Sequence, residues 1–340
     1  MGSGRNVAVY GASGHTGRFV VAELQERGHV PLLLGRDEGS LLRCWPGREV
    51  RPAPVHEPAA IDRALRGADA VINCAGPFAT TAAPLIEAAL RAGLPYVDVA
   101  AEIEANRDTF AHFGERARAA GTVVVPAMAF FGGLGDLLVT AAMRDWAVAE
   151  EVHIAYGLSD WHPTAGTLEA GAVSGRRRGG RRVRFTDGRL EYHDEVLPTV
   201  PWSFPAPLGR RDVIAGFTMA DVVTVPSHLD VPEVRTYMTV TAATDLSTSD
   251  ARTPAALDER DRSAQTFVVD VRVRRAGEER RAVASGRDIY AVSAPLAVEA
   301  MERILTGRTR TVGVASAGAA FDAADFLRSL APRGLELADG

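Results

Sequence analysis

The fold is decided by a strand-like run and the turn that follows it, Asn6-Val-Ala-Val-Tyr10 and then Gly11-Ala-Ser-Gly14-His-Thr-Gly17. The turn opens directly into a helix-like stretch from Arg18 to Arg27 with an apolar stripe, and Gly28 closes that stretch as a C-terminal cap. A strand, a glycine-rich turn and a helix in this order are typical of a dinucleotide-binding βαβ unit.

The same alternation continues through the first 130 residues or so. Apolar strand-like runs are expected at 30–34, 70–74, 96–99 and 122–126, with helix-like stretches between them. This pattern predicts a parallel sheet, and the lack of polar alternation indicates that the strands are buried on both faces. We therefore predict an α/β fold, a Rossmann-type doubly wound parallel sheet that binds its ligand beyond the carboxyl ends of the strands.

The glycine-rich turn is the first part of the predicted cofactor site. Gly11 permits the tight turn, Gly14 lets the backbone approach a pyrophosphate, and Gly17 allows the helix to pack closely on the strand. A GxxGxxG spacing also occurs in purely structural turns, which is the alternative interpretation. The turn residues assigned to cofactor binding are Gly11, Ser13, Gly14, His15, Thr16 and Gly17.

The residue type at the end of the second strand distinguishes a site for NAD from a site for NADP. Gly35-Arg36 stands there, and an arginine at this place accommodates a ribose 2′-phosphate, whereas an acidic residue would hold the 2′-hydroxyl. Asp37 follows, and we expect its side chain to point to the other face. The sequence therefore predicts NADP as the cofactor.

The strand at 70–74 ends in a second turn that faces the same edge of the sheet. Ala75, Gly76, Pro77 and Phe78 are expected to border the cofactor's ribose and nicotinamide, because Gly76 removes bulk and lets the backbone approach a ring. An ordinary strand-to-helix turn is the alternative.

The second half of the chain has a different pattern of expected strands and helices. Alternating runs at 152–156 and 267–273 and a hairpin around Asp187-Gly188 predict a mostly antiparallel sheet in an inserted α+β domain. The predicted domains are a dinucleotide-binding domain (1–133), a substrate or dimerisation domain (134–285) and a C-terminal helical return that packs on the first domain (286–340).

Candidate catalytic groups lie in this second half. His162, in the polar loop 159–167, has a side chain that titrates in the range useful for proton transfer. His228 and a phenol from Tyr237 or Tyr192 are further candidates, and for each the alternative is a side chain without a role in catalysis. The three residues assigned to catalysis are His162, Tyr237 and His228.

Six arginines fall within the nine residues 176–184. A solvated loop that enters the hairpin is one interpretation. The other is a phosphate-binding edge for a substrate linked to coenzyme A or to an acyl carrier. Nucleic acid is the least favoured partner for this segment, since the chain is acidic overall and no aromatic residues are interleaved with the arginines.

Length and composition limit the classes of protein to which the chain can belong. The chain has 340 residues, a formal net charge of −5 and two cysteines, which predicts about two globular domains without a disulfide framework. No metal-ligand spacing, serine-hydrolase elbow, signal peptide or membrane-spanning run is present in the sequence. We expect a cytoplasmic protein that binds neither nucleic acid nor a membrane.

The motifs together resemble the saccharopine dehydrogenase-like family of NADP-binding oxidoreductases. The resemblance is carried by the turn at 11–17, by Gly35-Arg36-Asp37, by residues 73–78, by Tyr96-Val-Asp98 with Glu102, and by Gly286-Arg-Asp288-Ile-Tyr290 with the tail 313–327. It implies a nicotinamide site near Gly76–Phe78, Ala101, Glu102 and Met128–Phe130. The chain departs from the family pattern at 131–136, which affects the substrate edge.

The expected function is that of an NADP(H)-dependent reductase. The family includes saccharopine reductases and trans-acting enoyl reductases, so the resemblance implies hydride transfer to a C=N or an activated C=C bond of a small or carrier-linked substrate. A non-catalytic NADP-binding sensor is the alternative, because a nucleotide-binding fold alone does not establish turnover. A homodimer formed through the antiparallel sheet is expected.

Overall fold

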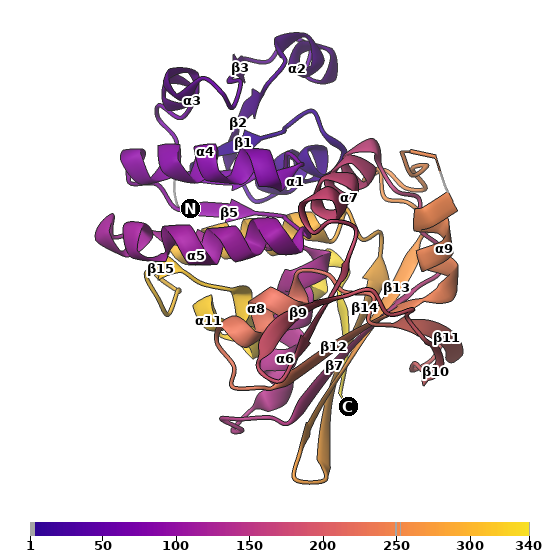
Figure 1. Cartoon of the computed structure of the whole chain (residues 1–340). Helices are drawn as coiled ribbons and strands as arrows, with labels where there is room; N and C mark the ends of the chain where they lie inside the picture. The colour runs from indigo at the N-terminus through magenta and orange to yellow at the C-terminus, as the bar shows by residue number, and fades with distance from the viewer. Residues whose placement is uncertain (1–3, 249, 252, 340) are drawn as a thin grey trace.

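The computed structural model describes residues 4–248, 250–251 and 253–339. The first half, together with β15 from the C-terminal segment, forms a seven-stranded parallel sheet in the order β15-β6-β5-β4-β1-β2-β3 (Figure 1). The predicted doubly wound sheet is confirmed. Its strands are β1 (Asn6–Tyr10), β2 (Val30–Gly35), β3 (Val50–Pro52), β4 (Ala70–Asn73), β5 (Tyr96–Asp98), β6 (Val123–Val125) and β15 (Gly313–Val314).

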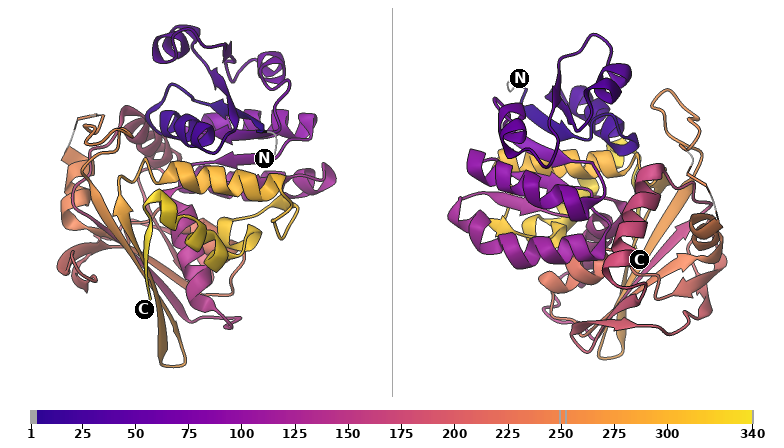
Figure 2. Two further views of the ribbon diagram at one scale, coloured as in Figure 1. Left: turned by 180° about the vertical axis from the view of Figure 1, so that it is seen from behind. Right: turned by 45° about the horizontal axis from the view of Figure 1, so that its top comes forward.

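Helices cover both faces of this sheet because its strands are apolar on both sides. In Figures 1 and 2, α4 and α5 lie on one face and α1 and α10 on the other. Strand β1 pairs with β2 on one side and β4 on the other, so the order reverses between β1 and β4, where a doubly wound sheet opens its ligand crevice. The helices are α1 (His15–Glu26), α2 (Glu38–Cys44), α3 (Pro58–Ala64), α4 (Phe78–Ala92), α5 (Ile103–Ala119) and α10 (Ser293–Leu305).

The second sheet is mostly antiparallel, as predicted; its β12–β7 pair is parallel. The predicted hairpin is present between β8 and β9, with Asp187 and Gly188 both at positive φ, as a two-residue turn requires. The strands are β7 (Glu151–Leu158), β8 (Arg182–Thr186), β9 (Arg189–His193), β10 (Thr199–Ser203), β11 (Arg210–Ala215), β12 (Glu233–Thr239), β13 (Thr266–Arg275), β14 (Glu278–Arg287) and β16 (Glu336–Asp339).

The helices of the second half join the two sheets. Helix α6 is almost wholly buried and packs against β13 and β14, and α7 reaches across to α4 and α5 of the first half. These helices are α6 (Gly135–Met143), α7 (Ala165–Arg177), α8 (Asp221–Thr224), α9 (Val240–Thr248), α11 (Ala317–Ala320) and α12 (Ala323–Ser329). None of the helices that the structure describes combines the length and apolar character needed to cross a membrane.

The last 55 residues contribute to both sheets. Helix α10 packs on α1, and β15 extends the parallel sheet beside β6. Strand β16 pairs instead with β14 of the second sheet, a connection that the sequence pattern did not reveal. The C-terminal segment therefore ties the two halves together.

Candidate functional site

A cavity of about 990 Å³ opens at the carboxyl ends of the parallel strands. One wall consists of the turns after β1, β2, β4 and β5, and the opposite wall consists of α7 and loops of the second sheet. This is the edge at which a doubly wound sheet binds its ligand. The two halves of the chain thus share one site.

The turn after β1 is a cradle in which side chains have no room. Gly11 adopts φ +83°, and a Cβ there would lie 2.9 Å from the Cβ of Ala75. A Cβ on Gly17 would lie 2.1 Å from the carbonyl oxygen of Gly11, so Gly17 packs the helix onto the turn and does not line the cavity. Gly14 is the N-cap of α1, and Ser13 and Thr16 line the cavity. The free amides at this helix start are suited to a pyrophosphate.

His15 has no polar partner within the described residues. Both ring nitrogens are buried without a hydrogen bond, and the ring makes edge contacts with Phe19 and Tyr290. Burial lowers the pKa of His15, and the nearby carboxylate of Asp288 only partly opposes this effect. The imidazole is therefore neutral at neutral pH and forms part of the cavity wall.

The turn after β2 has the features of a 2′-phosphate site. Arg36 lines the cavity and makes neither a hydrogen bond nor an ion pair within the described part of the chain. Asp37 also lines the cavity, and its carboxylate caps α2 by accepting from the amide of Ser40 at 2.7 Å. The hydroxyl-bearing Ser40 lines the cavity as well. A guanidinium without a hydrogen-bonded carboxylate partner, beside a hydroxyl, is suited to phosphate oxygens.

The ends of β4 and β5 form the floor of the cavity. Ala75, Gly76, Pro77 and Phe78 line it, as does Ala101.

Glu102 lines the cavity but holds the start of α4. Its two carboxylate oxygens accept from the amides of Phe78 (2.6 Å) and Ala79 (3.1 Å). Burial raises the pKa of Glu102, and the two amide hydrogen bonds partly oppose this rise. Met128 lies behind the wall, fully buried, and its amide donates to the carbonyl oxygen of Asp98. It does not reach the cavity, which corrects the expectation that it contacts the cofactor.

A buried carboxylate fixes the strand ends beneath this floor. Asp98 accepts from the amides of Ala127 (2.8 Å) and Ala100 (3.0 Å) and from the hydroxyl of Tyr96 (3.0 Å). Burial raises the pKa of Asp98 to about 6, although these hydrogen bonds oppose the rise. Asp98 therefore ties β5 to the segment after β6, and its role is positional.

The opposite wall carries a hydroxyl cluster that joins the polar loop 159–167 to Tyr290. The oxygen of Tyr290 accepts from the indole N–H of Trp161 (3.1 Å) and from the amide of Thr164 (3.3 Å). The hydroxyl of Thr167 lies 3.0 Å from it. Tyr290, Trp161, Thr164 and Thr167 all line the cavity. Gly166, beside Thr167, lines the cavity as well.

The three catalytic candidates are not brought together, and none of their side chains lines the cavity. The His162 ring is half exposed and lies 3.5 Å from Asp160, because its neighbour Trp161 takes the buried side of the loop. Only the backbone of His162 approaches Tyr290. This corrects the expectation for His162.

Tyr237 and His228 have structural partners instead. Tyr237 lies on the outer face of the second sheet, where its hydroxyl bonds Nδ1 of His153 at 2.8 Å, because the inward positions of β12 are taken by Thr236 and Met238, both fully buried. His228 bonds the fully buried carboxylate of Asp136 at 2.7 Å. Both expectations are corrected.

Some side chains of the arginine-rich segment 176–184 form ion pairs, and others line the cavity. Arg177 pairs with Asp108 at 2.6 Å, and Arg181 with Asp194 at 3.6 Å. Arg178 and Arg182 line the cavity. Arg178 also lies 3.4 Å from Glu104, whereas Arg182 donates only to backbone carbonyls.

No group of three or more His, Cys, Asp or Glu residues that could hold a metal ion occurs in the part of the chain that the structure describes. Both cysteines, Cys44 and Cys74, are free thiols.

Comparison with known proteins places the same features in context. Residues 11–122 match the family described as NAD(P)H-binding. The chain is 29% identical, over 42% of its length, to a probable mitochondrial saccharopine dehydrogenase-like oxidoreductase of Arabidopsis thaliana. It is 27% identical, over 39% of its length, to a saccharopine dehydrogenase-like oxidoreductase of Bos taurus. These matches span 35% and 36% of the two relatives, about a third of their length.

A solved structure of another protein matches the fold over nearly the whole chain. Apo saccharopine dehydrogenase (L-Glu forming) from Saccharomyces cerevisiae superposes with a TM-score of 0.65 at 13% identity, over 99% of this chain and all of that one. At this identity the likeness concerns the fold alone. The resemblance expected from the motifs is confirmed, and the chain carries an NAD(P)-binding domain.

Proposed function

Starting from the saccharopine dehydrogenase-like character of the chain, we propose that it is an NADP(H)-dependent oxidoreductase that transfers a hydride to a C=N or an activated C=C bond. The observation that carries the proposal is the single cavity that runs from the glycine-rich turn and Arg36 to the hydroxyl cluster of the second half. A dinucleotide site and a substrate wall in one cavity are what hydride transfer between two bound molecules requires.

Each part of the wall has a separate task. The amides at the start of α1 hold the pyrophosphate, and Arg36 with Ser40 holds the 2′-phosphate. When bound, the reduced nicotinamide supplies the hydride. Phe130, Phe131 and Trp161 line the inner part of the cavity, where apolar walls keep water from the reacting atoms.

Measurements of cofactor binding and of turnover distinguish the proposed reductase from the alternative, a non-catalytic NADP-binding sensor. We expect NADPH to quench tryptophan fluorescence at micromolar concentrations, and steady NADPH oxidation with at least one member of a panel of imines and enoyl thioesters. Binding without turnover over the whole panel would indicate a sensor. Absence of binding by either NADPH or NADH would refute both.

Arg36→Ala tests the choice of cofactor. We expect the Kd for NADPH to rise by about 10- to 100-fold, because one charge-assisted phosphate contact contributes about 1.5–3 kcal/mol. The Kd for NADH should stay within about twofold, since it has no 2′-phosphate. Arg48→Ala is the control, because Arg48 is exposed and lies outside the cavity. An equal loss for both cofactors in Arg36→Ala would contradict the assignment.

The arginine-rich segment suggests an anionic group on the substrate. We expect Arg182→Gln to raise KM by about tenfold for a substrate bearing a phosphate or carboxylate, because Arg182 faces the cavity without a carboxylate partner. The control is Arg181→Gln, whose side chain pairs with Asp194 away from the cavity. Equal KM values in the two variants would show that Arg182 does not bind the substrate.

A further inference from the structure

A reduction of C=N or C=C consumes a proton as well as a hydride, and four titratable groups of the cavity wall, Tyr10, Cys74, Glu102 and His15, are not arranged to deliver one. Burial raises the pKa of Tyr10 to about 12, and its hydroxyl donates to the carbonyl oxygen of Ala53. Burial also raises the pKa of the Cys74 thiol. Both oxygens of Glu102 are occupied by backbone amides, and His15 is neutral because burial lowers its pKa.

Tyr290 differs from these groups in the direction of its hydrogen bonds. Two N–H groups, the indole of Trp161 and the amide of Thr164, donate to its oxygen. Its own proton is therefore directed away from them, and the nearer of its two acceptors is the hydroxyl of Thr167 at 3.0 Å. The carbonyl of His162 is more distant, at 3.4 Å. The same two N–H groups would stabilise a phenolate after the proton has left.

Thr167 is placed where the proton is needed. It lies in the first turn of α7 and lines the cavity. The same helix covers the floor, because a Cβ on Gly76 would lie 3.7 Å from the Cβ of Ala170 and 3.8 Å from the carbonyl oxygen of Gly166. Gly76 belongs to the turn expected to border the nicotinamide, so a substrate on the ring would lie against the first turns of α7.

We propose that Thr167 and Tyr290 form a proton-delivery pair. Thr167 is the catalytic residue that touches the substrate, and Tyr290 is the positioning residue that returns a proton to the Thr167 oxygen. This inference rests on the proposed reductase function. As the substrate carbon receives the hydride, the Thr167 O–H bond breaks and its proton goes to the substrate nitrogen or to the electron-rich carbon. Tyr290 then gives its proton to the Thr167 oxygen, and water at the cavity mouth restores the phenol.

The first test uses the substrate of the panel that the unaltered protein reduces fastest. We expect Tyr290→Phe to lower kcat by about 100-fold, within the range for loss of general acid catalysis, with the Kd for NADPH unchanged. Tyr192→Phe is the control, because the Tyr192 hydroxyl bonds Arg107 outside the cavity.

Thr167 supplies a second variant that spares the Trp161 and Thr164 contacts of Tyr290. Thr167→Val should lose activity as Tyr290→Phe does, and Thr167→Ser should restore it. A merely structural cluster would instead change KM and kcat together and lower the unfolding midpoint. Full activity in Thr167→Val would overturn the pair while leaving the reductase function in place. Absence of turnover in the unaltered protein would refute the reductase function first.

A measurement without turnover tests the geometry. The indole N–H resonance of Trp161, assigned with Trp161→Phe, should move in Tyr290→Phe, because that variant removes the oxygen to which the indole donates. The resonance should keep its position in Tyr192→Phe. A Trp161 signal in Tyr290→Phe that is identical to that of the unaltered protein would contradict the pair.

Discussion

Arg303→Met is expected to lower the thermal unfolding midpoint by about 4 °C, corresponding to a loss of about 3 kcal/mol from breaking a buried ion pair. The Arg303 side chain is only 3% exposed. It lies 2.7 Å from Glu299 and 2.9 Å from Asp325, and its guanidinium stacks on Phe326. Methionine keeps the volume beside Phe326 but leaves a buried carboxylate oxygen without its cation.

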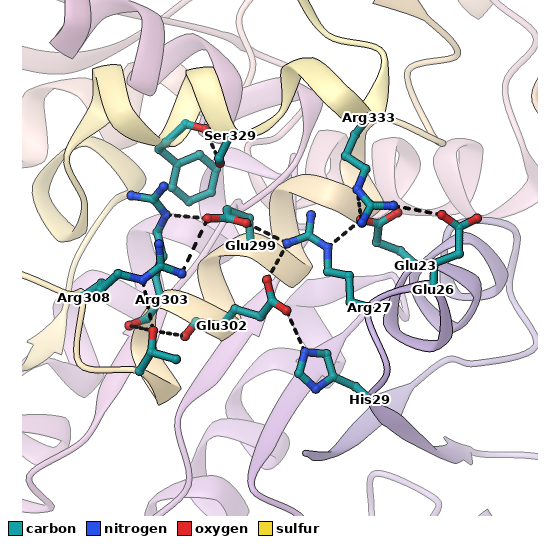
Figure 3. Close-up of polar contacts among 12 residues, drawn as sticks. Glu23, Glu26, Arg27, His29, Glu299, Glu302, Arg303, Arg308, Ser329 and Arg333 are labelled. Atoms are coloured by element: carbon teal, nitrogen blue, oxygen red, sulfur yellow. Dashed lines mark hydrogen bonds and ion pairs between the residues drawn. The ribbon is translucent and has the colours of Figure 1, made fainter. Parts of the chain in front are cut away.

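Figure 3 shows why this pair matters to the whole chain. Glu299 also binds Arg27 at 2.7 Å, and Arg27 binds Glu302 and Glu23 in turn. Arg333 reaches Glu23 from the C-terminal segment. The network therefore joins α1 of the nucleotide-binding half to α10 and to the segment that leads to β16.

The loss should depend on pH. Burial alone would raise the pKa of Glu299, but hydrogen bonds from Arg303 and Arg27 outweigh it and hold the pKa below its usual range. A lowered carboxylate pKa adds stability above the unfolded value of about 4.3 that is lost as pH falls through the folded value. Without Arg303 the Glu299 pKa rises, so the deficit of the variant should be largest at neutral pH and shrink towards about pH 4.

Arg308→Met is the matched control, because Arg308 is half exposed and lies 4.0 Å from the same oxygen of Glu299. An exposed ion pair contributes about 0–1 kcal/mol, so its midpoint should fall by about 1.5 °C or less. Differential scanning calorimetry at neutral and acidic pH measures both variants. A deficit for Arg303→Met as small as that of Arg308→Met would contradict the prediction.

Gly17→Ala is expected to weaken NADPH binding by about 100-fold, or about 2.7 kcal/mol. The added Cβ would lie 2.1 Å from the carbonyl oxygen of Gly11 and 2.9 Å from its carbon, and both are backbone atoms that cannot rotate away. Helix and turn must therefore separate, which moves the amides that would hold the pyrophosphate. Fluorescence titration with NADPH measures the loss.

The control for this change is Gly114→Ala in α5, where the nearest contact of the new Cβ is the flexible end of Arg118 at 3.8 Å. We expect unchanged binding and a stability gain of up to about 1 kcal/mol from helix propensity. NADPH binding by Gly17→Ala equal to that of the control would mean that the close packing of the turn is not needed for the cofactor.

Much of the nucleotide-binding half could be predicted because its signals are local. The turn at 11–17 needs Gly11 at positive φ and Gly17 in close contact, and both requirements appear as glycines at fixed spacing. The assignments for the second half failed where the side of a strand or loop had to be known. Tyr237 and His162 carry suitable chemical groups, but their neighbours Met238 and Trp161 occupy the positions that face inward.

The sequence by itself determined the parallel sheet, the dinucleotide cradle and the arginine at the end of β2, because strand periodicity and glycine spacing are properties of contiguous residues. Only the tertiary structure decided which groups line the cavity. Tyr290 and Thr167 stand 123 positions apart yet lie 3.0 Å apart, because the antiparallel sheet returns the chain to the glycine-rich turn. No short-range pattern encodes such a contact, since it depends on how two separately formed halves pack together.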